Sequence, residues 1–324
     1  MRIKEKVFLG CAYLKTILFG IKKPLLVSWE LTKRCNLRCK YCGSWLKQDD
    51  EIGPSQALEL IRSLYAMGTR VIRFTGGEPL LREDLPRLVN HCSDLGISVG
   101  IASNGILFPG MANEFKRLAA VSFSLDGPED IHDFIRGKGS HKQVMQAIDA
   151  AKEKNIYTTI SVTLNSRNLF SLDYILGLAR ELRVQTFFQP ALKTMLYSEE
   201  INPFKPDITQ FRQAMEVLIR EKRKNKFIGN SLASLKHMRC WPDKTAINCV
   251  AGKIICRIGS NGQMYPCPRA KVEKGELNVL KKSAKECFEG LTQPFCGECW
   301  CSLFVDLNLL SRLSPDTIID ALFM

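Results

Sequence analysis

Three cysteines stand close together near the start of the chain, at positions Cys35, Cys39 and Cys42. Soft thiolate ligands select zinc or iron–sulfur clusters, so the C-x-x-x-C-x-x-C spacing predicts a metal site. A zinc or ferredoxin-type site would normally have a fourth protein ligand nearby. The next histidine and cysteine are His91 and Cys92, far beyond this loop. An iron–sulfur cube held by three cysteines leaves one iron open for a small molecule, whereas a structural zinc completed by a distant residue is the alternative.

A glycine-rich turn follows the apolar run Val71–Phe74, with the sequence Thr-Gly-Gly-Glu-Pro over residues 75–79. Its glycines allow a tight turn whose backbone can approach a ligand closely. Alone, this motif is only a turn. Combined with the cysteine motif, and with Tyr41 at the aromatic position before Cys42, it resembles the radical S-adenosylmethionine superfamily.

This resemblance implies a [4Fe-4S] cluster on Cys35, Cys39 and Cys42, whose open iron is chelated by the amine and carboxylate of S-adenosylmethionine. It also implies a flavodoxin- or ferredoxin-type electron donor. No catalytic residue is assigned beyond the cluster itself. The predicted contacts to S-adenosylmethionine are Tyr41, Gly76, Gly77, Glu78, Pro79, Ser103, Asn104, Arg136 and Asn165.

From Pro24 onward, strand-like apolar runs alternate with stretches of helical spacing. The predicted strands are Leu25–Glu30, Val71–Thr75, Ser98–Ala102, Val121–Leu125, Thr158–Leu164 and Gln185–Gln189. The predicted helices are Ser55–Met67, Leu85–Leu95, Met111–Leu118, His141–Lys154 and Leu172–Leu182. Successive strand-then-helix units imply a parallel sheet, which right-handed crossovers let curl into a partial barrel. We therefore predict an α/β fold, a partial (β/α)6 TIM barrel, as the resemblance also implies.

In such barrels the chemistry collects at the carboxyl ends of the strands. The cysteine loop follows the first predicted strand and the glycine-rich turn follows the second. Ser103 and Asn104 follow the third strand, Asp126 and Gly127 end the fourth, and Asn165 follows the fifth. Asn-Gly and Asp-Gly pairs also favour ordinary turns, so these later segments have a second interpretation.

Eight of the thirteen cysteines lie between Cys240 and Cys301, which predicts a small α+β cysteine-rich subdomain at the C-terminal end. Cys249, Cys267, Cys296 and Cys299 resemble the twitch subdomain, a shortened SPASM extension, which implies one auxiliary [4Fe-4S] cluster. A zinc site on the same ligands stays open. A full SPASM extension has more cysteines after its C-x-x-C pair, whereas here only Cys301 follows. A second auxiliary cluster on the remaining Cys240, Cys256, Cys287 and Cys301 also stays open.

A chain of 324 residues with 45% hydrophobic content can form one large and one small unit. We predict a cap at residues 1–23, a barrel at 24–202, a helix and basic linker at 203–239, the auxiliary region at 240–302 and a helical tail at 303–324. The apolar run Val7–Ile21 is too short to span a bilayer, so it either packs as a cap or lies peripherally at a membrane surface.

The formal net charge is +13, yet Lys and Arg are spread over the chain and the one dense run, 220–226, is typical of a solvated helix end. We therefore expect no nucleic-acid partner. The clustered cysteines indicate a reducing cytoplasm. Buried free thiols are expected at Cys11 and Cys92, and surface or capping roles at His132 and His141.

The resemblance implies reductive cleavage of S-adenosylmethionine to a 5′-deoxyadenosyl radical, which takes a hydrogen atom from a substrate. An auxiliary cluster with four cysteine ligands has no open iron, which favours electron transfer and oxidation of the substrate. Peptide or protein maturation is the first predicted function. The alternatives are oxidation of a carbohydrate or cofactor precursor, modification of a lipid at the membrane surface and, outside enzymes, an iron–sulfur electron carrier.

Overall fold

The computed structural model describes residues 3–46, 49–196, 198–268, 270, 272–273, 275–293 and 296–311. One sheet runs through it in the order β6-β5-β4-β3-β2-β1-β7-β8, and all pairs are parallel except β7 with β8. The first six strands are β1 Leu26–Thr32, β2 Val71–Gly76, β3 Ser98–Ser103, β4 Ala120–Ser124, β5 Tyr157–Leu164 and β6 Gln185–Pro190. The predicted α/β partial barrel is confirmed.

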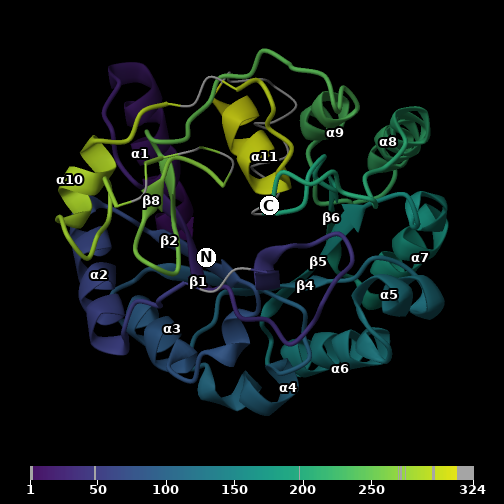
Figure 1. Cartoon of the computed structure of the whole chain (residues 1–324), viewed down its shortest axis with the longest axis horizontal. Coiled ribbons are helices and arrows are strands. Elements are labelled where there is room, and N and C mark those ends of the chain that lie inside the picture. The colour runs from purple at the N-terminus through teal and green to yellow at the C-terminus, as the bar shows by residue number, and fades with distance from the viewer. Residues whose placement is uncertain are drawn as a thin grey trace.

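Helices surround the curved sheet on its outer side (Figure 1). They include α2 Pro54–Met67, α3 Leu85–Asp94, α5 Glu129–Arg136, α6 Ser140–Glu153, α7 Leu172–Leu182 and α8 Ile208–Lys222. Alternation along each strand explains this packing, because successive side chains point to opposite faces. On β2, Ile72 and Phe74 are fully buried in the hydrophobic core, whereas Arg73 and Thr75, at the alternating positions, are only half-buried on the inner face of the barrel.

The predicted helix Met111–Leu118 is wrong. The structure has a short helix α4, Phe108–Met111, followed by the 3₁₀ turn η3, Ala112–Glu114. The helix starts earlier because Pro109 suits its first turn. It then ends early because Phe115 folds back to stack on Phe108, with ring centroids 6.1 Å apart. Helix α5, which sequence periodicity did not indicate, carries Arg136 in its last turn.

The C-terminal region extends the sheet of the barrel. Strand β7, Ile255–Ile258, pairs in parallel with β1 and continues into an antiparallel partner, β8, Met264–Tyr265. The two strands form a β-hairpin. Arg257 on β7 forms a buried ion pair with Glu30 on β1, with Nη2 and Oε2 2.8 Å apart. Charge pairing and backbone pairing together fix this region against the barrel.

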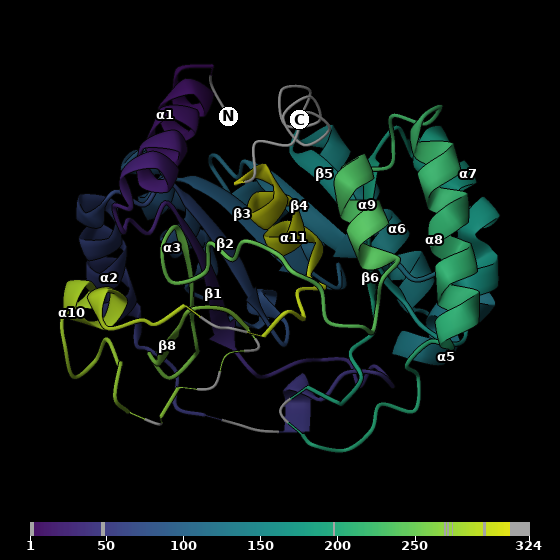
Figure 2. The ribbon, with the colours of Figure 1, turned by 90° about the horizontal axis from the view of Figure 1, so that it is seen from above.

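Two further C-terminal helices flank this hairpin, α10 Ala284–Glu289 and α11 Ser302–Leu310. Helix α11 packs on α9, Leu232–Met238, and on β6. Seen from above, α11 lies within the curve of the sheet, and the loops at the carboxyl ends of the strands gather at one side of the molecule (Figure 2). The predicted tail therefore begins as a helix, whereas residues 312–324 lie outside the described residues.

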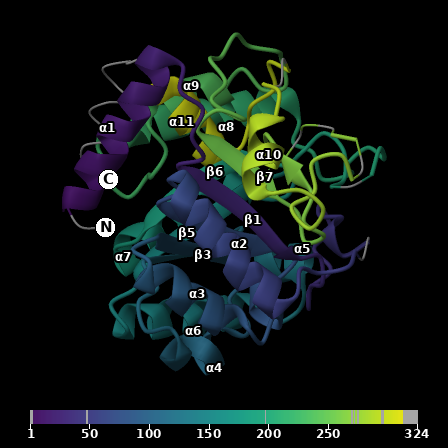
Figure 3. The same cartoon turned by 90° about the vertical axis from the view of Figure 1, so that its left-hand side faces the viewer.

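Helix α1, Ile3–Phe19, packs along one side of the molecule (Figure 3). Tyr13 forms a small buried cluster with Leu25, Val250 and Ile254. Cys11 lies off this packed face and is exposed, so its predicted burial is wrong, whereas Cys92 is buried as predicted. Among the described residues, no helix is both long and apolar enough to cross a membrane.

Candidate functional site

The N-terminal cysteine loop, which we define as Cys35, Cys39 and Cys42, begins just after β1 ends at Thr32. Within the loop, the Leu37 amide donates to Cys35 Sγ at 3.4 Å and the Cys42 amide donates to the Cys39 carbonyl at 3.0 Å. The pKa of Cys39 is raised to about 11, mainly by burial; Arg136 opposes this rise, whereas the neighbouring thiols of Cys42 and Cys35 add to it. The three thiols therefore act on one another, and ligation must displace their protons.

The glycines of the 75–79 turn allow a close approach between two stretches of backbone. The Gly77 amide donates to the Thr32 carbonyl at 2.7 Å, and the Glu78 amide donates to the Arg34 carbonyl at 2.8 Å. A Cβ on Gly77 would lie 2.3 Å from the Arg34 oxygen, and one on Gly76 would lie 2.3 Å from the Thr32 oxygen. These glycines are therefore required for docking the turn onto the segment that leads into Cys35.

Glu78 connects this turn to the end of β3. Its Oε1 accepts hydrogen bonds from Ser103 Oγ at 2.8 Å and from the Leu80 amide at 3.1 Å, and its Oε2 accepts from the Asn104 amide at 2.8 Å. Burial raises the pKa of Glu78 to about 7, while these three donors favour the carboxylate. Asn104 Nδ2 in turn donates to Asn36 Oδ1 at 2.8 Å. The structure thus brings three predicted contacts together beside the cysteine loop.

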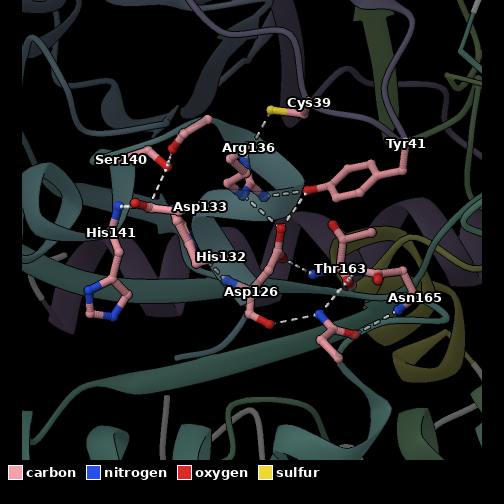
Figure 4. Close-up of polar contacts among 12 residues, drawn as sticks. Cys39, Tyr41, Asp126, His132, Asp133, Arg136, Ser140, His141, Thr163 and Asn165 are labelled. Atoms are coloured by element: carbon pink, nitrogen blue, oxygen red, sulfur yellow. Dashed lines mark hydrogen bonds and ion pairs between the residues drawn. The ribbon is translucent and has the colours of Figure 1, made fainter. Parts of the chain in front are cut away.

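Arg136, Asp126 and Tyr41 form a closed ring of polar contacts (Figure 4). Arg136 Nε donates to Asp126 Oδ2 at 2.7 Å, Tyr41 OH donates to the same oxygen at 3.0 Å, and Arg136 Nη2 donates to Tyr41 OH. Arg136 Nη1 lies 3.9 Å from Cys39 Sγ. The ring therefore places a buried guanidinium against one predicted cluster ligand.

Asp126 is the residue of this ring that the sequence did not identify, because its Asp-Gly pair is also an ordinary turn signal. Its side chain is fully buried, and its Oδ1 accepts from the Thr163 amide at 3.0 Å. Its own amide donates to His132 Nδ1 at 3.1 Å. Burial lowers the pKa of His132 to about 3, so this imidazole is a neutral hydrogen-bond acceptor that holds the turn.

Two predicted contacts are engaged in local backbone structure. Asn165 is fully buried, its Nδ2 donates to the Thr163 carbonyl at 2.9 Å, and its Oδ1 accepts from the Arg167 amide at 3.0 Å. Pro79 opens the 3₁₀ turn η2, Pro79–Leu81. The side chain of Asn165 thus closes its own turn after β5, and its contact with S-adenosylmethionine stays a prediction.

Loops far apart in the sequence bring the C-terminal cysteines together. Burial raises the pKa of Cys249, and the thiols of Cys267 and Cys296 raise it further. The pKa of Cys299 is likewise raised, first by burial and then by the neighbouring Cys301, Cys249 and Cys267. Asn308 Nδ2 donates to Cys299 Sγ at 3.3 Å. We call the predicted ligands Cys249, Cys267, Cys296 and Cys299 the C-terminal cysteine set.

The other C-terminal cysteines do not form a comparable group. Cys256 and Cys287 are fully buried in the main hydrophobic core, and Cys240 Sγ lies 3.8 Å from the Lys236 carbonyl. Cys301 instead lies with the C-terminal cysteine set. The structure gives no support to a second auxiliary cluster on these four residues.

A cavity of about 1020 Å³ connects the two cysteine sites. Tyr41 and Cys42 line it on the barrel side, together with Thr163 of β5 and Gln189 of β6. Its C-terminal lining contains Cys249, Cys267, Cys296, Cys299 and Cys301. A molecule held in this cavity would therefore lie between the two predicted clusters.

The residues around each cysteine site suit an anionic iron–sulfur cluster. Donors point at Cys35 Sγ and Cys39 Sγ, as expected where thiolates carry negative charge. Beside Cys299, the buried Nε1 of Trp300 has no hydrogen-bond partner among the described residues. This N–H could donate a hydrogen bond to a sulfur atom of a cluster. No three Cys, His, Asp or Glu side chains in the described part converge on one single-ion position. An iron–sulfur cube holds its thiolates at separate corners.

Comparison with known proteins defines the class. Residues 29–178 match the family described as the Radical SAM superfamily, so the chain contains a radical SAM domain. Enzymes of this family use a [4Fe-4S] cluster and S-adenosylmethionine. The predicted class of this segment, with its [4Fe-4S] cluster and S-adenosylmethionine, is confirmed, whereas the auxiliary cluster stays a prediction.

Two curated relatives show how far the likeness extends. The chain is 31% identical over 211 residues to Fe-coproporphyrin III synthase of Methanosarcina barkeri, covering 63% of this chain and 52%, about half, of that protein. It is 29% identical over 300 residues to mycofactocin maturase MftC of Mycolicibacterium smegmatis, covering 85% of this chain and 74% of the relative.

Solved structures share the fold. Streptococcus suis SuiB bound to S-adenosylmethionine superposes with a TM-score of 0.67 at 16% identity, covering 84% of this chain and 67% of that chain. The structure of anSMEcpe with bound AdoMet gives a TM-score of 0.66 at 19% identity, covering 82% and 80%.

Proposed function

We propose that this chain is an S-adenosylmethionine-dependent oxidoreductase that removes hydrogen from a peptide held in the cavity between its two cysteine sites. The observation that supports the proposal is the shared cavity, with Tyr41 and Cys42 on one side and the C-terminal cysteine set on the other. A cluster on the N-terminal cysteine loop would supply an electron to the bound sulfonium, giving methionine and a 5′-deoxyadenosyl radical.

The protein itself positions and shields this chemistry. Cys35, Cys39 and Cys42 would hold the cluster, and Arg136 would place its charge beside Cys39 and the carboxylate of S-adenosylmethionine. Tyr41 and Asp126 hold that guanidinium in place. Closure of the cavity around a bound substrate would exclude water and so protect a reactive intermediate. Cys249, Cys267, Cys296 and Cys299 would hold the auxiliary cluster, which would supply an acceptor for the electron left on the substrate after hydrogen abstraction.

A tetrapyrrole precursor is the second candidate substrate, because Fe-coproporphyrin III synthase is among the curated relatives and the cavity volume of about 1020 Å³ could hold such a molecule. Peptide maturation stands first because the match to MftC, named a maturase, covers 85% of this chain. A cytoplasmic location, a flavodoxin- or ferredoxin-type donor and peripheral membrane contact through α1 belong to the same proposal. Leu18 and Phe19 on α1 are 66% and 72% exposed, which suits such contact.

The two sites can be separated by Cys299→Ala in anaerobic assays with dithionite and S-adenosylmethionine. We expect this variant to lose about half of its iron, to form 5′-deoxyadenosine at a rate within about threefold of the parent and to make no oxidised product. The substrate arms are a pool of short synthetic peptides and Fe-coproporphyrin III, each followed by mass spectrometry for loss of hydrogen. Equal iron in variant and parent would contradict the auxiliary cluster.

A further inference from the structure

The inner face of the barrel is unusual for this architecture. Barrel interiors are normally filled by bulky branched side chains. On strands β1 to β5 the inward positions are small or polar, and they include Ser28, Arg73, Thr75, Gly100, Ala102, Ser122, Ser124, Ser161 and Thr163. Most of them are only half-buried. The interior therefore has both room and hydrogen-bonding groups for a ligand.

Two arginines stand at the same level of this inner face, on either side of Ser28. Strand register pairs Ser28 with Arg257 on β7 and with Arg73 on β2. Arg257 is neutralised by Glu30, at 2.8 Å. Arg73 forms no ion pair or hydrogen bond with any residue that the structure describes. A cation inside a barrel without a counter-charge is costly, because burial removes its hydration.

Space lies open next to Arg73. Its register partner on β3 is Gly100, which has no side chain, and a Cβ built there would meet only the Ala120 carbonyl, at 3.9 Å. Burial lowers the pKa of Arg73, and the electrostatic interaction with Cys301 opposes that shift. Cys301 lines the cavity between the two cysteine sites. Arg73 shares the inner face of the barrel with Thr163 and Gln189, which also line that cavity.

The cavity lining is also biased toward positive charge. Lys244 and Lys253 line it, and Glu298 is the single acidic residue in the described lining. Leaving the cysteine ligands aside, the side chains of the described lining, together with Arg73, carry more positive than negative charge. Such an arrangement favours a bound anion. The planar guanidinium of arginine is suited to a carboxylate, which it can bind through two parallel hydrogen bonds.

We propose that Arg73 binds a carboxylate of the substrate inside the barrel, so that the substrate is a carboxylate-bearing molecule held between the two cysteine sites. This inference rests on the proposed function and narrows the class of its substrate. A peptide C-terminus and a tetrapyrrole propionate present the same chemistry. The alternative role of Arg73 is to balance the charge of an auxiliary cluster.

The test measures binding to the reconstituted full-length protein with S-adenosylmethionine and without reductant. The probes are Fe-coproporphyrin III with its tetramethyl ester, and a pool of short peptides with free or amidated C-termini. We expect the parent to prefer the carboxylate form of one pair. Arg73→Met should weaken that binding about 10- to 100-fold, and Arg73→Lys should restore part of it. Binding of the blocked probes, the tetramethyl ester and the amidated peptides, should be the same in the parent and in both variants. Iron content should stay unchanged. Arg87→Met, on the exposed face of α3, is the matched control.

Three outcomes would overturn the assignment of Arg73. One is equal affinity of the parent and Arg73→Met for the free carboxylate probe. Another is a parent that binds blocked probes as well as free ones, or binds neither pair. The third is a loss of iron in Arg73→Met, which would indicate that the positive charge of Arg73 balances an auxiliary cluster on the C-terminal cysteine set. Because no turnover is measured, failure of the proposed oxidation leaves these results interpretable.

Discussion

The two cysteine sites are built in opposite ways. The N-terminal cysteine loop draws its ligands from a single short segment at the end of β1, and the ends of β2, β3 and β4 brace it through Glu78, Asn104 and Asp126. The C-terminal cysteine set draws its ligands from positions 249, 267, 296 and 299, which loops bring together. Asn308 on α11 donates a side-chain hydrogen bond to Cys299 Sγ of this set. The N-terminal site, which is predicted to bind and orient a second molecule, is thus held in place by hydrogen bonds from several neighbouring strand ends.

The largest expected difference comes from removing one ligand of the N-terminal loop. Cys39→Ala should lower formation of 5′-deoxyadenosine by about 1000-fold or more, because the cluster and its substrate act as a unit. Anaerobic assays with dithionite measure this rate. Cys11→Ala, which removes an exposed thiol, is the control and should match the parent. Unchanged turnover in Cys39→Ala would refute the main site.

The bracing around Arg136 can be tested by Asp126→Asn. The change keeps the size of the side chain but leaves the buried guanidinium without its charged partner at 2.7 Å. Loss of an outer partner of a metal ligand typically lowers activity by about 10- to 100-fold, and we expect that range for cleavage of S-adenosylmethionine. Asp94→Asn, at an exposed ion pair with Arg117, should have no effect.

The corresponding change at the C-terminal set is Asn308→Ala. This removes the donor 3.3 Å from Cys299 Sγ and the acceptor for the Val250 amide. We expect a lower iron content and loss of oxidised product, with cleavage of S-adenosylmethionine within about threefold of the parent. If Asn308→Ala slowed this cleavage as much as Asp126→Asn did, the two sites would not be separable.

Alanine substitutions at two glycines, one in the turn that docks on the N-terminal cysteine loop and one in the C-terminal region, compare how well the backbone of each region tolerates a Cβ. Gly77→Ala places a Cβ 2.3 Å from the Arg34 oxygen and should lower the free energy of unfolding by about 3 kcal/mol. Gly262→Ala, at a φ of +84°, should cost about 1 to 2 kcal/mol through left-handed strain. Urea denaturation of apoprotein measures both. Gly177→Ala, which meets nothing within 4 Å, should not destabilise.

The smallest effect concerns the pH dependence contributed by His132. Its pKa is about 3 when folded and about 6.5 when unfolded, so only the unfolded chain gains this proton as the pH falls below 6.5. Stability should therefore drop by about 1.4 kcal/mol between pH 7.5 and pH 5.5 from this group. His132→Gln should reduce that acid sensitivity, measured by urea denaturation at both pH values. An identical pH slope in the variant would show that His132 contributes nothing.

The sequence alone determined the class of enzyme and the six barrel strands, and it predicts the N-terminal ligands. These follow from spacing within short segments, and local spacing is what a sequence displays directly. The prediction failed where a distant contact decided the local structure. Stacking of Phe115 on Phe108 ended the helix predicted over Met111–Leu118, and the packing of Tyr13 turned Cys11 outward.

Only the tertiary structure revealed what several of these residues do. Gly77 is needed for contact with backbone more than forty positions earlier, and Asp126, which resembles a turn residue in the sequence, holds Arg136 and Tyr41. Arg73 reads as one polar residue in an apolar run, yet its strand register places it inside the barrel without a charged partner among the described residues. The reason is physical: spacing fixes which side chains share a strand or turn, whereas the folding of separate strands decides which charges and surfaces meet.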